Sequence, residues 1–171
     1  KVLADLTGYA PKMPQWATGF WQSRLRYETQ EELLSVARKY KELGIPLSAI
    51  ICDYFHWTEQ GDYKFDPKYW SDVKAMADEL HDMNTKLIVS VWPTINEKSE
   101  NYWHMVDRNM LMRTVHGSDR VFNFYGWQAE IDVTNPDTRE FVWNKLKENY
   151  IDNGVDALWF DEAEPEIHPE Q

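Results

Sequence analysis

The segment Lys86-Leu87-Ile88-Val89-Ser90-Val91-Trp92 decides the fold class of this 171-residue chain. It is nearly continuous in apolar residues rather than alternating, and so is Leu47-Ser48-Ala49-Ile50-Ile51-Cys52-Asp53. Strands with this pattern are buried on both faces, as in a parallel sheet that helices cover. Two further β-rich runs, residues 17–23 and 155–161, complete a set of four predicted strands.

Amphipathic helical patterns separate these strands. Thr29 can cap a helix with Glu32 at the capping-box spacing, and Gly44 is placed to end that helix. A second helix is predicted over about 69–83, and a third over about 135–153, where proline suits the first turn. Strands that alternate with helices in this way are typical of βα units.

The interval between the third and fourth predicted strands is much longer than the others. It contains a predicted helix around 100–110, followed by a hairpin or loop over 115–133 whose tip is expected at 116–119. A full (β/α)8 barrel takes about 250 residues, so four units correspond to half of one. We therefore predict an α/β fold, the N-terminal half of a TIM barrel with an insertion between its third and fourth strands, as one truncated domain over residues 1–171. A doubly wound nucleotide-binding sheet is disfavoured, because no Gly-rich phosphate loop follows the first strand.

The composition limits the class of partner. A net charge of −11 argues against nucleic acid and anionic membranes, and no apolar run approaches the roughly 20 residues of a membrane span. The single cysteine, Cys52, excludes an internal disulfide. Aromatic residues make up 15% of the chain, with nine Trp beside many carboxylates, which is typical of a sugar-binding cleft. A non-catalytic carbohydrate-binding module would share this composition but would not account for the βα pattern.

Candidate site residues stand at the carboxyl ends of the predicted strands, where βα folds place their active sites. Asp161 follows a segment that is expected to be buried, so its carboxylate leaves the core at a fixed position and could act as a nucleophile. Asp53 could be a second catalytic group, an acceptor for sugar hydroxyls or a loop cap. His56 lies among aromatic residues without an evident acid partner, so packing or ligand contact is expected of it. No metal site and no cofactor are predicted.

Several motifs, taken in order along the chain, resemble glycoside hydrolase family 31, the α-glucosidase and α-xylosidase family. They are residues 6–17, Phe20-Trp21-Gln22-Ser23-Arg24, Asp53-Tyr54-Phe55-His56-Trp57, Phe65-Asp66-Pro67, Trp92-Pro93-Thr94-Ile95, Asp132-Val133-Thr134-Asn135-Pro136 and Trp159-Phe160-Asp161-Glu162-Ala163-Glu164-Pro165.

The resemblance implies a role for each candidate residue. Asp161 corresponds to the nucleophile of a retaining, double-displacement mechanism, and Asp53 to a residue that binds hydroxyls of the sugar being cleaved. The other substrate-binding positions that it implies are Phe55, Trp92, Trp127, Trp159 and Glu164, with a supporting role for the last.

The resemblance also suggests a substrate. The motif Phe-Asp-Glu-Ala-Glu-Pro-Glu around Asp161 is closer to that of the α-xylosidase branch than to that of the α-glucosidase branch. However, Leu25 stands where we expect Glu in the α-xylosidase branch. The expected function is hydrolysis of the α-xylosyl or α-glucosyl end of an oligosaccharide by an α-xylosidase. An α-glucosidase of the same family and a non-catalytic carbohydrate-binding module are the alternatives. The family's acid/base carboxylate is expected beyond residue 171, so this chain alone should be inactive. The rest of the barrel, or self-association, is expected to cover its exposed sheet edges.

Overall fold

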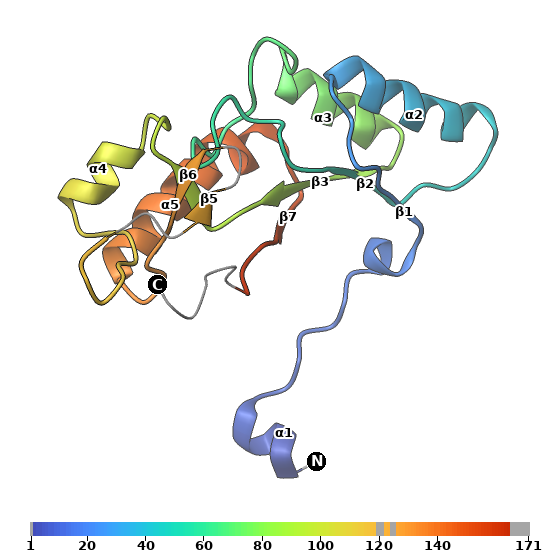
Figure 1. Ribbon diagram of the computed structural model, residues 1–171. Coiled ribbons are helices and arrows are strands. Elements are labelled where there is room, and N and C mark those ends of the chain that lie inside the picture. The colour runs from blue at the N-terminus through green and yellow to red at the C-terminus, as the bar shows by residue number, and fades with distance from the viewer. Residues whose placement is uncertain (1, 119–121, 124–125, 165–171) are drawn as a thin grey trace.

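The computed structural model describes residues 2–118, 122–123 and 126–164. Four parallel strands form the main sheet in the order β1-β2-β3-β7 (Figure 1). Their bounds are Trp21–Gln22 for β1, Ala49–Cys52 for β2, Lys86–Val91 for β3 and Ala157–Phe160 for β7. The predicted α/β class is confirmed, and each strand falls within the run that predicted it.

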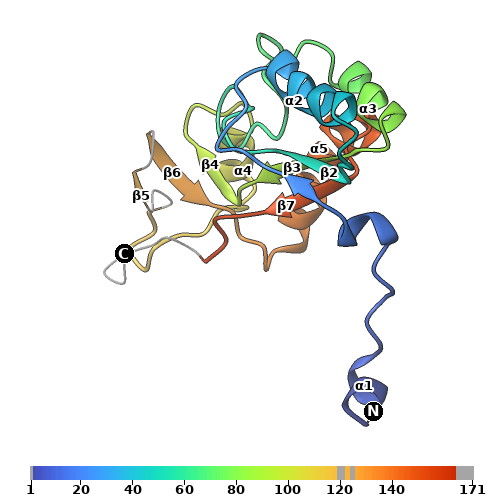
Figure 2. The same ribbon diagram turned by 90° about the vertical axis from the view of Figure 1, so that its right-hand side faces the viewer.

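The predicted first strand is wrong in its first half. Residues Gln15–Thr18 form the 3-10 helix η1, and β1 is only two residues long. The ring of Trp16 stacks on that of Trp21 with centroids 5.4 Å apart, which holds η1 folded back against the short strand. Apolar and aromatic residues therefore contact each other locally here instead of extending along the sheet. Before η1, the helix α1 (Val2–Thr7) has no buried residue and stands apart from the sheet (Figures 1 and 2).

The helix α2 spans Gln30–Glu42 and begins as predicted. The Thr29 side chain accepts a hydrogen bond from the Glu32 amide at 3.2 Å, and the Glu32 carboxylate accepts one from the Glu28 amide. The helix α3 (Val73–Asp82) begins later than predicted, because the side chain of Asp72 caps it by accepting from Ala75 at 2.9 Å.

The helix α5 spans Pro136–Asn149, and the 3-10 turn η2 (Ile151–Asn153) follows it. The side chain of Asn135 caps α5 by accepting from Asp137 at 2.9 Å, with Pro136 in the first turn. The predicted third helix is therefore confirmed at its start, while its last residues belong to η2.

The insertion between β3 and α5 contains, in its described residues, a small antiparallel sheet and one α-helix. Its strands are β4 (Thr94–Asn96), β5 (Phe122–Asn123) and β6 (Trp127–Glu130), in the order β4-β6-β5, and the helix α4 spans Tyr102–Asp107. The predicted hairpin is thus present. However, the paired chain reverses between Asn123 and Trp127, so the tip predicted at 116–119 is wrong. Residues 114–118 close a separate turn, in which Thr114 donates to Ser118 at 2.7 Å, and Asp119 lies outside the described residues.

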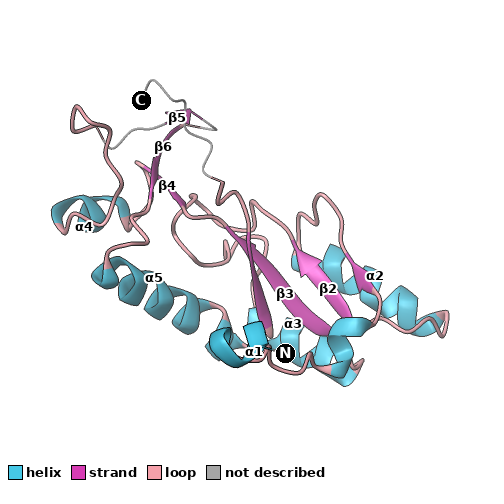
Figure 3. Ribbon diagram, turned by 90° about the horizontal axis from the view of Figure 1, so that it is seen from below, coloured by secondary structure: helices cyan, strands magenta, loops and turns pink. Residues whose placement is uncertain are grey.

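The helices α2 and α3 lie over one face of the parallel sheet, and the views of Figures 2 and 3 agree on this. Alternate strand residues point into the core on that face: Ile50, Cys52, Leu87, Val89 and Val91. They pack against α2 and α3 residues such as Leu33, Ala37, Met76 and Leu80. The opposite face therefore carries Ala49, Ile88 and Ser90, and in the same alternation the residues that follow the strand ends. Among the described residues, no helix is long and apolar enough to cross a membrane.

The segment before Asp161 is not buried as predicted. Trp159 is 39% exposed and Phe160 is 64% exposed. The reason is tertiary: β7 pairs with β3 on one side, and no described strand pairs with its other side. An apolar sequence therefore lies at an edge of the described sheet, with a paired strand on one side only.

Candidate active site

Three of the predicted site residues follow directly on paired strand positions. Cys52 is paired with Val89, and Val91 with Phe160, so Asp53, Trp92 and Asp161 all leave the sheet at the carboxyl end of its strands. The amide of Asp161 donates to the carbonyl of Val91 at 3.1 Å, which fixes the Asp161 backbone beside the end of β3. By strand alternation, these three residues belong to the face opposite α2 and α3.

Asp53 is a buried carboxylate, 8% exposed. Its Oδ1 accepts a hydrogen bond from the Tyr54 amide at 2.8 Å. Burial raises the pKa of Asp53 above its usual range; the Tyr54 amide opposes that rise, and the negative charge of Asp161 adds to it. The two carboxylates are therefore close enough to repel each other, and a bound sugar could relieve this by donating hydroxyl hydrogens.

Aromatic side chains lie at the same carboxyl end of the sheet. Trp92 lies 5.1 Å from Tyr54, 5.7 Å from Trp57 and 6.2 Å from Phe55, measured between ring centroids. The guanidinium of Arg26 lies over the Phe55 ring at 5.5 Å. Phe55 has a φ of 59°, a left-handed conformation that costs a non-glycine residue about 1–2 kcal/mol. The surrounding rings hold it in that strained position, as is common in binding loops.

A pocket of about 420 Å³ opens beside this aromatic cluster. Apolar ring faces and hydrogen-bonding groups meet in it, a combination that suits a sugar, which presents C–H faces and hydroxyls. Its lining residues are Arg26, Tyr54, Phe55, Trp57, Thr58, Glu59, Gln60 and Gln128. Of these, the sequence predicted only Phe55. The polar members come from three separate parts of the chain, and no local pattern links them.

The remaining predicted residues are more scattered. Trp159 lies on β7 on the same alternation as Asp161, and Glu164 is exposed three residues beyond Asp161. Trp127 is exposed on β6, beside Gln128, which does line the pocket. The structure thus brings Asp53, Phe55, Trp92 and Asp161 to the carboxyl end of the parallel sheet, with Trp127 on the neighbouring insertion. Glu166, the last residue of the motif Phe-Asp-Glu-Ala-Glu-Pro-Glu, lies outside the described residues.

His56 packs in the core instead of facing the site. Its Nδ1 lies 3.1 Å from the carbonyl oxygen of Asp53, and its Nε2 lies 2.8 Å from the Tyr150 hydroxyl. A carbonyl only accepts, so Nδ1 carries the hydrogen and Nε2 accepts from Tyr150. Burial lowers the pKa of His56 to about 4, with the Asp53 carbonyl opposing, so the ring is neutral near pH 7. It supports the backbone of Asp53 and is not a general base.

The lowered pKa of His56 predicts acid sensitivity. The unfolded chain takes up a proton on this ring below its ordinary pKa of about 6.5, whereas the folded protein does so only near pH 4. The contribution of His56 to stability is therefore fully present above pH 6.5 and is lost as the pH falls to 4, by up to about 3 kcal/mol. Chemical denaturation between pH 4 and 7.5 measures this loss, and His56→Gln should flatten the pH profile.

The control for this prediction is His104→Gln, since His104 is exposed on α4 and stacks on Phe141. It should keep the profile of the parent protein. Parallel profiles for the parent and His56→Gln would contradict the prediction.

In residues 2–118, 122–123 and 126–164, no group of three or more His, Cys, Asp or Glu could hold a metal ion. The chemistry available at the strand ends is that of two carboxylates beside aromatic rings.

Comparison with known proteins identifies the family and the relatives that this chain matches. The family described as "Glycosyl hydrolases family 31 TIM-barrel domain" matches residues 10–171. A family 31 glucosidase, ORF2, of Pseudescherichia vulneris is 43% identical over 163 residues, which are 95% of this chain and 31% of the relative. Alpha-xylosidase A of Aspergillus niger is 35% identical over 95% of this chain and 22% of its own length. The chain thus spans about a fifth to a third of these two relatives.

A solved structure agrees with the fold. The crystal structure of a GH31 alpha-xylosidase from a soil metagenome, complexed with xylose, superimposes with a TM-score of 0.91 at 46% identity. The match covers 94% of this chain and 24% of that one. The parallel sheet with its helices therefore matches the N-terminal part of that TIM barrel.

Proposed function

Because this chain belongs to glycoside hydrolase family 31, we propose that it carries the nucleophile and part of the sugar site of a retaining α-xylosidase. Residues 1–171 would form one part of the catalytic barrel domain. The observation that carries the proposal is the position of Asp161, at the carboxyl end of β7 beside Trp92 and within the electrostatic influence of Asp53. An oligosaccharide with an α-xylosyl end is the proposed substrate.

The proposed reaction has two displacements. The Asp161 carboxylate attacks the anomeric carbon while the bond to the leaving-group oxygen breaks, and a carboxylic acid protonates that oxygen. Water then attacks the resulting glycosyl ester, the same acid group now accepts its proton, and Asp161 is released. Asp53 would accept hydrogen bonds from sugar hydroxyls, and the rings of Phe55 and Trp92 would contact the sugar. Trp127, Trp159 and Glu164 would complete the sugar's surroundings.

The acid/base group is proposed to lie outside these 171 residues. Retaining glycosidases hold their two carboxyl groups about 5–5.5 Å apart across the scissile bond. Asp53 is a carboxylate on which the charge of Asp161 acts, but its burial and its place on the same sheet face suit the sugar rather than the leaving group. The 171-residue chain by itself is therefore expected to be inactive, and its open sheet edges are expected to be covered by the rest of the barrel or by self-association.

We propose xylose rather than glucose as the sugar because of the names and identities of the relatives. Two named α-xylosidases and the xylose-bound structure are 35–46% identical to this chain, whereas a named α-glucosidase of Bacillus thermoamyloliquefaciens is 28% identical. The 43% identical relative of Pseudescherichia vulneris is named a glucosidase, and it supports the alternative sugar. α-Glucosidase activity is the second candidate. The parallel sheet with Asp161 at its edge favours both over a non-catalytic carbohydrate-binding module.

The test uses a protein that contains this chain within a complete barrel. Incubation with 5-fluoro-α-xylosyl fluoride should trap a glycosyl ester, which peptide mass spectrometry should locate on Asp161. Aryl α-xyloside should be hydrolysed with a higher kcat/KM than aryl α-glucoside, and the 171-residue chain should hydrolyse neither. A label on another residue would exclude Asp161 as the nucleophile, and a glucoside preference would favour the second candidate.

A further inference from the structure

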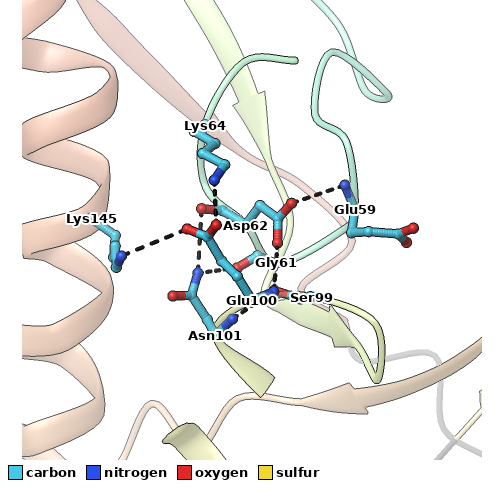
Figure 4. Close-up of polar contacts among 8 residues, drawn as sticks. All are labelled: Glu59, Gly61, Asp62, Lys64, Ser99, Glu100, Asn101 and Lys145. Atoms are coloured by element: carbon cyan, nitrogen blue, oxygen red, sulfur yellow. Dashed lines mark hydrogen bonds and ion pairs between the residues drawn. The ribbon is translucent and has the colours of Figure 1, made fainter. Parts of the chain in front are cut away.

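A buried polar cluster lies behind the loop that follows β2. Its members come from that loop and from the segment after β4, and their side chains and backbone groups meet one another (Figure 4). Asp62 is 4% exposed, and Ser99 and Asn101 are equally buried. Burial of a carboxylate is costly unless its oxygens are hydrogen-bonded, so the way in which Asp62 is satisfied shows what it does.

The Asp62 carboxylate joins the two segments. Its Oδ1 accepts from the Ser99 hydroxyl at 2.8 Å and from the Glu100 amide at 3.1 Å. Its Oδ2 accepts from the Glu59 amide at 3.1 Å. Both oxygens are used only as acceptors, one toward the segment after β4 and the other toward its own loop. Asp62 therefore holds the backbone at Glu59 to a fixed point on the insertion.

The loop backbone is held at neighbouring positions as well. The Asn101 side chain donates to the carbonyl of Gly61 at 2.9 Å, and the Asn96 amide donates to the carbonyl of Gln60 at 2.9 Å. Gly61 has a φ of 92°, and a Cβ there would lie 2.9 Å from the Cα of Ile95. The loop thus approaches the insertion too closely for any other residue at that position.

The held loop forms one wall of the pocket at the proposed sugar site. Glu59 and Gln60 line that pocket together with Phe55 and Trp57. The Gln60 side chain also donates to the Thr94 hydroxyl, which ties it to β4. Since Asp62 binds the Glu59 amide from the buried side, loss of that bond would loosen the wall at Glu59 without removing any lining group from it.

We propose that Asp62 is a positioning residue, which acts through Glu59 and Gln60 to hold the pocket wall in the shape that binds the sugar substrate. This inference rests on the proposed glycosidase function for its kinetic consequence. Its structural consequence, a loop whose order depends on the Asp62 carboxylate, is independent of that function.

The variant that tests the proposal is Asp62→Asn. An asparagine keeps one acceptor oxygen for Ser99 and Glu100, but its amide group then faces the Glu59 amide, so two donors oppose each other. In the complete barrel enzyme, KM for an aryl α-xyloside should rise about tenfold, with kcat per active site unchanged, because binding alone is weakened. Active sites are counted by trapping with the 5-fluoro-α-xylosyl fluoride.

The matched control is Glu100→Gln, which makes the same carboxylate-to-amide change in the same cluster. The Glu100 carboxylate pairs with Lys64 and, at 3.9 Å, with Lys145 of α5, on the half-exposed side (Figure 4). Exposed ion pairs contribute little, and the Glu100 amide that binds Asp62 is untouched by this change. KM should therefore stay at the parent value.

A structural residue without a positioning role would lower the number of trapped active sites and leave KM unchanged, and that result would overturn the proposal. If Asp62→Asn does not fold, Ser99→Ala removes one donor without opposing two donors, and KM should rise about two- to threefold.

Hydrogen exchange of the enzyme gives a second readout. Amides of residues 58–62 should exchange faster in Asp62→Asn than in the parent or in Glu100→Gln. Unchanged exchange there would overturn the proposal, even if the parent hydrolysed no α-glycoside at all.

Discussion

Replacement of Asp161 by Asn is expected to lower kcat/KM for aryl α-xylosides on the order of 10⁴-fold or more in the complete barrel enzyme, since the bond to the anomeric carbon then has no nucleophile. The side chain keeps its shape, and the backbone bond from the Asp161 amide to Val91 remains, so the fold should be unaffected. Steady-state kinetics and a thermal melt together measure the two effects. The corresponding control is Asp152→Asn, since Asp152 is exposed before β7 and pairs with Lys147.

A rescue experiment makes this prediction specific to a nucleophile. Asp161→Ala leaves space at the attacking position, which azide can enter as an external anion. Azide should then form a bond to the anomeric carbon while the aryl leaving group departs, giving a glycosyl azide of inverted, β configuration. Recovery of an α-configured azide, or no loss of activity in Asp161→Asn, would assign the nucleophile elsewhere.

The second large effect is expected at Asp53. The hydrogen bonds proposed between sugar hydroxyls and the buried Asp53 carboxylate are charge-assisted, so Asp53→Ala should lower kcat/KM about a hundredfold. Asp53→Asn should fall between the parent and Asp53→Ala, because the amide keeps one acceptor and the Tyr54 amide can still donate to it. Kinetics with α-xyloside and with its 2-deoxy analogue measure the contribution of a hydroxyl directly.

The control for Asp53 is Asp78→Asn, an exposed residue of α3 that pairs with Lys74. It should not change kcat/KM. If Asp53→Ala lowered activity equally on the substrate and on each of its deoxy analogues, sugar hydroxyls would not be its partners. Asp53 would then support the site in another way, through the loop that His56 also contacts.

Much of the fold could be predicted because its signals are local. The continuous apolar runs of β2 and β3 indicate strands buried on both faces, and Thr29 and Asn135 cap helices with their own nearby amides. The strands β1 and β4 could not be predicted to the residue. Each is only two or three residues long, and each exists because a partner strand pairs with it.

Some residues of the candidate site could likewise be predicted from the sequence, and others could not. Asp53, Trp92 and Asp161 could be named from the sequence, because each follows a recognisable strand and the carboxyl ends of parallel strands meet at one edge. Arg26, Gln60 and Gln128 could not be named, since they come together in one pocket only through the packing of the β2 loop against the insertion.

By itself, the sequence determined the four segments that contain the parallel strands, which carboxylates follow them and, through its motifs, the family. Those properties depend on local residue order. The tertiary structure alone decided that Trp159 and Phe160 are exposed at the edge of the described sheet and that His56 is neutral in the core. It also decided that the buried Asp62 carboxylate accepts hydrogen bonds from the Glu59 amide and from Ser99. Exposure, pKa and hydrogen-bond partners depend on neighbours that are distant in the chain, and only packing specifies those neighbours.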